Sequence, residues 1–243
     1  GKNIVCYEEV ESTNQLAKEA ADKGAVEGTI ILAEEQKGGQ GRIGREFYSP
    51  KGGIWLSFIL RPELKAVLAT RATYIASLAL AKTIDKLTTL EPRIKWPNDI
   101  LIDGAKVSGI LTEMGAELDQ INYLVIGIGI NANFSKSELP KKVEASVTTL
   151  FSELGSKIDR VDFIQQLLSF IEESYQSIND FDSLLTEWKD YAYTLGEDVV
   201  IINRDDKIYG QAVDIASDGA LLVEVDSKEQ RVYSGDVSLR HQN

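Results

Sequence analysis

The sequence predicts an α+β fold, in which a mixed, mainly antiparallel sheet with helices precedes a small C-terminal β-barrel. Two patterns predict the first part: some segments carry apolar residues at helical spacing, and others are short apolar runs bounded by turn residues. A third pattern predicts the barrel. From residue 196 onward, short apolar strands alternate with Asp-Gly-type turns.

The N-terminal part is expected to alternate strands with helices. Residues 3–8 favour a strand, after which Ser12 and Gln15 fit a capping box that opens a helix ending near Gly24. A second strand is expected at 28–36, and the apolar run 53–61 predicts a third strand with both faces covered. Apolar residues at helical spacing over 66–89 predict a long amphipathic helix.

Strands and then helices are expected in the remainder of this first domain. The strands fall at 93–96, 99–102, 105–117 and 122–130. Residues 132–146 are polar and contain Pro140, which predicts a mobile loop, and helices are expected at 147–154, 160–179 and 183–193. The pattern therefore divides the chain into a larger domain, 1–194, and a barrel domain, 195–243.

Composition limits the classes of function. A chain of 243 residues with 43% hydrophobic residues has enough apolar side chains for a core, and its net charge of −12 argues against broad binding to nucleic acid or anionic membranes. The lone Cys6 excludes an intramolecular disulfide framework and a CxxC metal site. No apolar run approaches the roughly 18 residues that a membrane span requires, and the acidic N-terminus is unlike a signal peptide. We therefore expect a cytoplasmic protein.

A glycine-rich loop between two predicted strands carries the clearest chemical signal. It reads Lys37-Gly-Gly-Gln-Gly-Arg-Ile-Gly-Arg45, and residues 37–51 hold four basic side chains against one acidic one. Glycine lets the backbone approach a ligand closely, and exposed backbone N–H groups with arginines suit a phosphate. The loop is neither a Walker A motif nor a dinucleotide-binding fingerprint. The alternative is a flexible connection with incidental arginines.

Two further clusters stand on the strands that follow. Lys95-Trp-Pro-Asn-Asp99 precedes the apolar strand that contains Lys106, and an inward lysine costs energy unless an anion meets it. Taken alone, the first cluster is also a tight turn with an Asx motif. Gly127 and Gly129 alternate along a strand and so leave one face bare for a flat ligand, although close packing against a helix explains them equally well.

Together these clusters resemble those of biotin–protein ligases. That family carries a GRGRxGR-type loop, a KWPND segment, a K-[LV]-x-G-I-L strand and a GIGIN strand in this order, and its first helix opens with Ser-Thr-Asn, as residues 12–14 do here. The resemblance implies a class II synthetase-like biotin/lipoate ligase fold with an SH3-like C-terminal barrel. It also implies the short form, without the N-terminal DNA-binding domain of some relatives.

The resemblance implies an activity as well. ATP would convert biotin to biotinyl-5′-AMP, and the biotin would then pass to a lysine of a biotin carboxyl carrier protein. Arg42 and Lys106 match the catalytic positions. The implied biotin-binding residues are Ser12, Thr13, Asn14, Gln36, Gly39, Gln40, Gly41, Arg42, Lys106, Gly109 and Gly129. The implied ATP-binding residues are Arg42, Arg45, Lys106, Asn98 and Asn131, and Asn98 with Asp99 would help to hold Mg²⁺.

Two positions depart from the family pattern. Gln40 replaces the first arginine of the loop, which removes one positive charge, and Phe47 stands where a tryptophan is common. The lone His241 is the third residue from the C-terminal end, so no histidine base is expected. A homodimer is favoured by the apolar strand 54–60 and by the habit of the family, with no nucleic acid or membrane as partner. The alternatives are a lipoate or octanoate ligase of the same fold and a non-enzymatic biotin or adenylate sensor.

Overall fold

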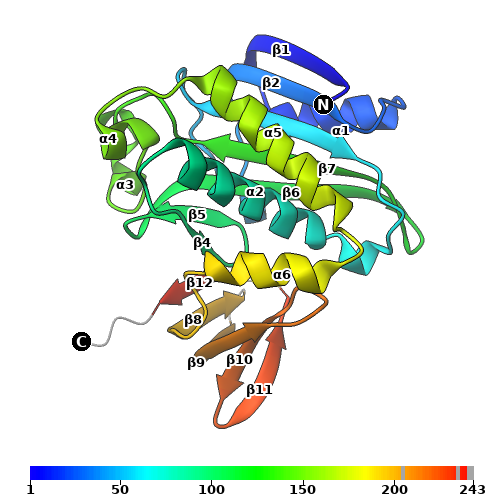
Figure 1. Ribbon diagram of the computed structural model, residues 1–243, viewed down its shortest axis with the longest axis vertical. Helices are drawn as coiled ribbons and strands as arrows, with labels where there is room; N and C mark the ends of the chain where they lie inside the picture. The colour runs from blue at the N-terminus through cyan, green and yellow to red at the C-terminus, as the bar shows by residue number, and fades with distance from the viewer. Residues whose placement is uncertain (204–205, 234–235, 240–243) are drawn as a thin grey trace.

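A seven-stranded sheet forms the centre of the larger domain in the computed structural model, which describes residues 1–203, 206–233 and 236–239. The order of its strands is β1-β2-β3-β7-β6-β5-β4 (Figure 1). Their bounds are β1 Asn3–Val10, β2 Thr29–Gln36, β3 Ile54–Leu60, β4 Arg93–Lys95, β5 Asp99–Ile102, β6 Ala105–Glu117 and β7 Gln120–Ile130. Only β1 and β2 pair in parallel, so the predicted mixed, mainly antiparallel sheet is confirmed.

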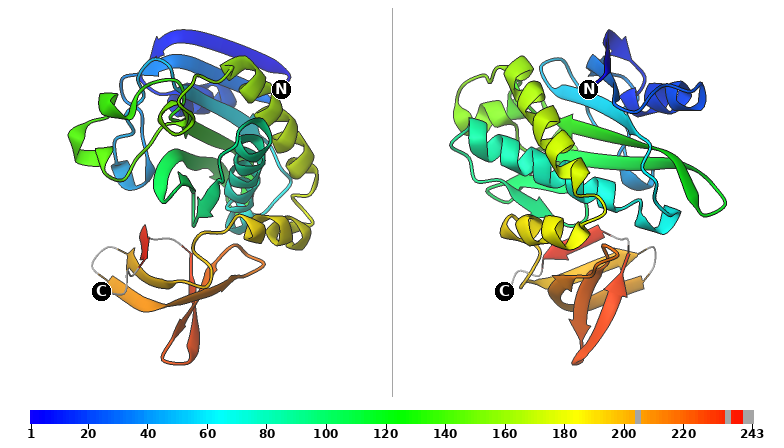
Figure 2. Two further views of the ribbon diagram at one scale, coloured as in Figure 1. Left: turned by 60° about the vertical axis from the view of Figure 1, so that its left-hand side comes forward. Right: turned by 45° about the vertical axis from the view of Figure 1, so that its right-hand side comes forward.

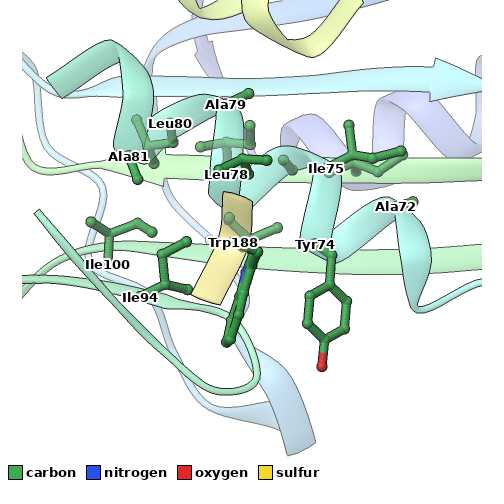
Figure 3. Close-up of a cluster of buried hydrophobic side chains, with 14 of the residues drawn as sticks. Ala72, Tyr74, Ile75, Leu78, Ala79, Leu80, Ala81, Ile94, Ile100 and Trp188 are labelled. Atoms are coloured by element: carbon green, nitrogen blue, oxygen red, sulfur yellow. The ribbon is translucent and has the colours of Figure 1, made fainter. Parts of the chain in front are cut away.

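Helices cover both faces of this sheet. Helix α1 (Thr13–Asp22) connects β1 to β2 and buries Ala17 and Ala21 against one face. Helices α2 (Arg71–Leu87) and α5 (Arg160–Gln176) lie on the other face, as the views in Figure 2 show. The main hydrophobic core lies between that face and α2, and Figure 3 shows Ile75, Leu78 and Ile100 within it.

Strand β3 is the most buried strand of the sheet. All seven of its residues are buried, because it pairs with β2 and β7 and has helices on both faces. The predicted cover on both faces is therefore confirmed. The same burial removes strand 54–60 as the surface of a homodimer, because a strand enclosed within one protomer has no face left for a second.

In two segments the observed secondary structure differs from the predicted one. The helix expected over 66–89 is a 3₁₀ turn, η2 (Ala66–Leu68), followed by α2 from Arg71. The amide of Ala66 donates to the carbonyl of Asp119, which ties this turn to the β6–β7 hairpin and leaves Val67 65% exposed. The expected loop 132–146 contains η3 (Lys136–Glu138) and α3 (Lys141–Glu144), and it buries Phe134 and Leu139 against Trp55.

The later helices begin directly after capping side chains: α5 starts at the predicted residue, whereas the other two start two or three residues away from it. Thr149 caps α4 (Leu150–Leu154), Asp159 caps α5 and Asp180 caps α6 (Phe181–Asp190), each by accepting a backbone N–H of the first turn. The helices expected at 147–154, 160–179 and 183–193 are therefore confirmed, with shifted ends. None of the helices in the described ranges is long and apolar enough to cross a membrane.

The C-terminal residues form a second, antiparallel sheet of order β11-β10-β9-β8-β12 below the first (Figure 1). Its strands are β8 Asp198–Asn203, β9 Asp206–Ile215, β10 Leu221–Val225, β11 Lys228–Val232 and β12 Asp236–Leu239. The predicted succession of short strands is confirmed. Its buried residues, such as Val199 and Ile201, belong to the same hydrophobic cluster as α2 and α6. His241 lies outside the described residues.

Candidate active site

A cavity of about 330 Å³ opens at one end of the central sheet. The start of α1, the glycine-rich loop, the turn before β5 and the glycine-bearing parts of β6 and β7 contribute to its wall. Every residue that the sequence assigned to the site lines this cavity except Gly39. The fold therefore brings together segments that lie more than 100 positions apart in the chain, from Ser12 to Asn131.

The glycine-rich loop folds back on itself as a small hairpin. The Gly41 amide donates to the Arg45 carbonyl over 2.7 Å, and the Phe47 amide donates to the Gly39 carbonyl over 2.8 Å. A Cβ on Gly39 would lie 2.4 Å from the Phe47 carbonyl oxygen, so only glycine permits this closure. Gly39 therefore stands behind the cavity wall and shapes the hairpin, whereas Gln40, Gly41, Arg42 and Arg45 face the cavity.

Arg42 connects the hairpin to the KWPND segment. Its Nη1 donates to Oδ1 of Asn98 over 3.1 Å, and the Asn98 Nδ2 donates to the Ile110 carbonyl over 2.7 Å. The second bond fixes the orientation of the Asn98 amide, because Nδ2 can only donate and a carbonyl can only accept. The guanidinium of Arg42 thus reaches the middle of the cavity from the loop side.

Lys106 reaches the same place from β6. Its Nζ lies 2.7 Å from Oδ1 of Asp99 and 5.6 Å from the centre of the Phe47 ring, and both charged side chains are about a quarter exposed. The prediction that an inward lysine must meet an anion is confirmed, and in this structure that anion is Asp99. The pairing follows from the β5–β6 ladder, in which Asp99 stands opposite Gly109, three residues beyond Lys106.

The proposed magnesium ligands do not form a metal site in this structure. Oδ1 of Asn98 accepts from Arg42, and Oδ1 of Asp99 pairs with Lys106, so cations of the protein already engage both oxygens. Across the ranges that the structure describes, no cluster of three or more His, Cys, Asp or Glu side chains is arranged to hold a metal. The expectation that Asn98 and Asp99 provide a metal site therefore finds no support in the donor set, since one oxygen of each already pairs with a cation of the protein.

Three glycines on β6 and β7 make the floor of the cavity. Gly109 pairs directly with Gly129, and Gly127 stands two residues before it on β7. A Cβ on Gly129 would lie 2.7 Å from the Phe47 ring, and one on Gly127 would lie 2.0 Å from Oδ1 of Asn14. The predicted bare face exists, and Phe47 and Asn14 lie directly on it. Because Asn14 belongs to the first turn of α1, the alternative explanation, close packing against a helix, also applies to Gly127.

A buried polar network closes one end of the cavity. Oε1 of Gln36 accepts from the Thr13 amide over 2.8 Å, and Nε2 of Gln36 donates to Oγ of Ser49 over 3.0 Å. The Asn14 Nδ2 donates to Oε2 of Glu113 over 2.9 Å and to the Leu111 carbonyl over 3.3 Å. These partners set both amide orientations, because a backbone amide only donates and a carboxylate only accepts.

Ser57 completes this network from inside the sheet. Its fully buried hydroxyl lies 2.6 Å from Oδ1 of Asn14 and 2.8 Å from Oγ1 of Thr13. Oδ1 can only accept, so the single Ser57 proton points to Asn14, and the Thr13 proton then points to Gln36 or Ser57. Thr13 and Asn14 both line the cavity, and their oxygens are left with lone pairs that can accept further hydrogen bonds.

Ser12 adds the opposite polarity at the same end of the cavity. Its Oγ accepts the Gln15 amide over 3.4 Å as the N-cap of α1, which leaves the hydroxyl proton available to a ligand. The predicted N-cap is confirmed, although the Gln15 side chain donates to Glu19 rather than completing a capping box. One donor and two acceptors thus stand side by side.

Asn131 lies at the opposite end of the cavity. It is buried, and its Nδ2 donates to the Thr148 carbonyl over 2.9 Å. The backbone of Lys106 bonds to Ser146 and Thr148, which brings α3 and the segment after it to the cavity and adds Val143 and Val147 to the wall. This end has apolar walls and one amide, which suits a flat heteroaromatic ring.

Sequence reasoning missed several residues of the site. Ser57, Ser49 and Glu113 orient the cavity side chains, and Val143 and Val147 line its far end. Ser57 had a signal, because it is the only polar residue in the apolar run Ile54–Leu60, and a buried hydroxyl needs a partner. The two valines had none, because Val143 fell in the predicted loop 132–146 and Val147 at the start of the predicted helix 147–154.

Known proteins are similar to this chain in sequence and in fold. Residues 7–131 match the Biotin/lipoate A/B protein ligase family, and residues 194–240 match the Biotin protein ligase C terminal domain. The bifunctional ligase/repressor BirA of Bacillus subtilis is 36% identical over 98% of this chain and 74% of its own length. Biotin–[acetyl-CoA-carboxylase] ligase of Paracoccus denitrificans is 29% identical over 93% of this chain and 96% of its own.

Solved structures give the same result. The biotin protein ligase of Aquifex aeolicus, determined in complex with biotin and ATP, superposes with a TM-score of 0.85 at 28% identity, and each chain is covered completely. The family match spans residues 7–131, from the middle of β1 to the residue after β7, and therefore includes the glycine-rich loop, the KWPND segment and the glycine floor. On these grounds the chain belongs to the biotin protein ligase family.

Proposed function

We propose that the cavity binds biotin at its Ser12–Asn14 end and the adenine of ATP at its Asn131 end. The biotin carboxylate and the α-phosphate would then meet between Arg42 and Lys106. The observation that carries this proposal is the convergence of these two cations on the middle of one cavity, from the loop and from β6. The relative from Aquifex aeolicus was solved with the same two small molecules, biotin and ATP.

The polarity of the biotin end supports this orientation. The ureido group of biotin is a carbonyl flanked by two N–H groups. Ser12 offers a donor for the carbonyl, and the oxygens of Thr13 and Asn14 offer acceptors for an N–H. Neither octanoate nor lipoate has an N–H to offer, so either acid would leave these acceptors unpaired at a cost of about 1–3 kcal/mol each.

Arg42 and Lys106 provide the electrostatic part of the chemistry. Two like charges about 4 Å apart repel by about 4 kcal/mol at an effective dielectric near 20, so a carboxylate approaches a phosphate only with cations between them. A carboxylate oxygen attacks the α-phosphorus, the bond to the bridging oxygen breaks, and pyrophosphate leaves with that electron pair. Catalysis consists of positioning and charge stabilisation, with no covalent enzyme intermediate.

Mg²⁺ would enter with the phosphates of ATP rather than occupy a site built by the protein. Asn98 and Asp99 instead act as partners of Arg42 and Lys106. Arg45 lines the same cavity and is proposed as a further contact of the phosphates.

The second half-reaction joins biotin to a carrier. A lysine amine of the carrier attacks the carbonyl of biotinyl-5′-AMP, AMP leaves, and an amide forms. The relative from Paracoccus denitrificans is named for acetyl-CoA carboxylase, which supports the biotin carboxyl carrier domain of such an enzyme as the partner. The proposed homodimer needs a surface other than β3, and the edge strand β1, whose Ile4, Val5 and Tyr7 are exposed, is the candidate.

One assay tests the proposed function. ATP–pyrophosphate exchange is measured with biotin, lipoate or octanoate as the only acid, and exchange is expected with biotin alone. Exchange with lipoate or octanoate but not with biotin would support the alternative ligase. Biotin binding without any exchange would support the sensor.

A further inference from the structure

Tyr74 connects three parts of the molecule through one buried hydroxyl. It projects from α2 beside Trp188, whose ring centre lies 5.0 Å away (Figure 3). Its hydroxyl donates to the Gly219 carbonyl over 2.8 Å and accepts from Nε1 of Trp96 over 2.9 Å. Tyr74 and Trp96 are each only 2% exposed, so neither group can exchange its partner for bulk water. Burial also raises the pKa of the Tyr74 phenol, which therefore remains a donor.

Gly219 belongs to the C-terminal sheet, in the turn between β9 and β10. Its φ of +84° suits glycine, and an added Cβ would lie 3.0 Å from Oγ1 of Thr70 and 3.2 Å from Cε2 of Tyr74. Oγ1 of Thr70 also donates to the carbonyl of Asp218 over 3.4 Å. The turn therefore fits closely against the start of α2, with Tyr74 as its deepest contact.

Trp96 belongs to the KWPND segment, and residues that lead into the C-terminal sheet also fix its position. Its amide donates to Oγ1 of Thr194 over 3.1 Å, at the point where the chain enters the C-terminal sheet. Ile94, two residues earlier, bonds to the backbone of Tyr191 and Tyr193. The start of this segment is thus held by Tyr74 on one side and by residues 191–194 on the other.

The end of the segment enters the active site within three residues. Asn98 accepts from Arg42, and Asp99 pairs with Lys106. A small displacement of Trp96 would shift both partners relative to the cations that bring carboxylate and phosphate together. Reactions that depend on near-attack geometry are sensitive to misplacements on the order of 1 Å.

We propose that Tyr74 is a positioning residue for adenylation. Through Trp96 it holds Asn98 and Asp99 against Arg42 and Lys106, and through Gly219 it makes that placement depend on the docking of the C-terminal sheet. This inference rests on the proposed function. It concerns the centre of the site, where carboxylate and phosphate would meet, and not the ureido contacts, because neither Tyr74 nor Trp96 contacts the Ser12–Asn14 end through any hydrogen bond among the described residues.

Tyr74→Phe and Thr83→Val form a matched pair. Each removes one buried hydroxyl from α2 with little change in volume, and the Thr83 hydroxyl bonds only within the helix, to the Ala79 carbonyl. We expect Tyr74→Phe to lower kcat/KM for ATP in biotin-dependent exchange by about tenfold, which is the effect of losing the buried hydrogen bond that holds Trp96. Biotin affinity, measured by calorimetry, should change less than about twofold. Thr83→Val should change neither quantity, although it lowers the melting temperature.

The outcomes separate the inference from the proposed function. Absence of biotin-dependent exchange in the wild-type protein would refute the proposed function, and with it this inference. Normal exchange in the wild type with equal kinetics for Tyr74→Phe and Thr83→Val would refute the positioning role alone. Equal losses of ATP and biotin affinity in Tyr74→Phe would also refute it, because they indicate general loosening.

Gly219→Ala tests the same contact from the C-terminal side. The added methyl group presses on Thr70 and Tyr74, so kcat/KM for ATP should fall while biotin affinity is retained. Combined with Tyr74→Phe, its effect should be smaller than the product of the two single effects, because both act on one contact. Full multiplicativity would contradict the proposed connection.

Discussion

The ammonium nitrogen of Lys106 lies 2.7 Å from Oδ1 of Asp99 in the middle of the cavity. The charge of the lysine is therefore balanced by the protein itself. A substrate carboxylate or phosphate that reaches Lys106 competes with Asp99 for the same cation. This competition makes Lys106 more important for the transition state, where negative charge is concentrated, than for binding biotin.

Lys106→Ala should slow adenylation far more than it weakens biotin binding. The removed cation stabilises the approach of two anions, whereas the ureido contacts of biotin remain. We expect a loss of at least 100-fold in the exchange rate, or about 2.7 kcal/mol, against less than about tenfold in biotin affinity. Lys82→Ala removes an ion-paired lysine on α2 and serves as the control. Equal losses in rate and affinity would contradict a role at the reacting centre.

Asp99→Asn should strengthen the binding of biotin. The substitution removes a carboxylate that competes for Lys106, so the biotin carboxylate meets less repulsion, and about a threefold to tenfold gain is expected. Biotin methyl ester, which has no charge, is the control ligand and should bind as before. Calorimetry measures both. An equal change for acid and ester would show that Asp99 acts through shape rather than charge.

Thr13→Val should impair biotin recognition and leave ATP recognition intact. The variant keeps the shape of the side chain but removes the acceptor that faces the cavity and the bond to Gln36. Loss of 1–3 kcal/mol corresponds to about 5–150-fold in KM for biotin. The measurement is steady-state exchange with each substrate varied in turn. A KM for biotin that stays within about twofold of the wild-type value would exclude Thr13 as a ureido contact.

Gln40→Arg should slow the release of biotinyl-5′-AMP. Gln40 lines the cavity on the exposed hairpin, and a guanidinium there would attract the phosphate of the adenylate. We expect dissociation, followed with labelled adenylate, to slow by about tenfold at low salt. Gln40→Glu should accelerate it. If both variants release the adenylate at the wild-type rate, position 40 acts through its backbone.

Local patterns predicted most of the secondary structure because burial imposes a period on the sequence. The run Ile54–Leu60 is apolar except for Ser57 because it is covered on both faces. The apolar residues of α2 recur at helical spacing because one side of the helix packs against the sheet. The pattern was less informative at 132–146, where Phe134 and Leu139 are buried by long-range contact with Trp55. It also extended α2 too far, because Val67 has the spacing of a helix but lies on a turn tied to β6–β7.

For the cavity, too, some properties were determined by the sequence and others only by the tertiary structure. By itself, the sequence determined the residue types of the site: a glycine loop with arginines, an inward lysine, bare glycines and a capped helix start. The tertiary structure alone decided their partners: it paired Lys106 with Asp99, engaged Asn98 with Arg42, and placed Gly39 behind the wall. It also assigned Ser57 and Tyr74 to the surroundings of the site. The reason is that hydrogen-bond partners and charge pairs are set by strand register and helix docking, which join residues far apart in the chain and leave no periodic trace in it.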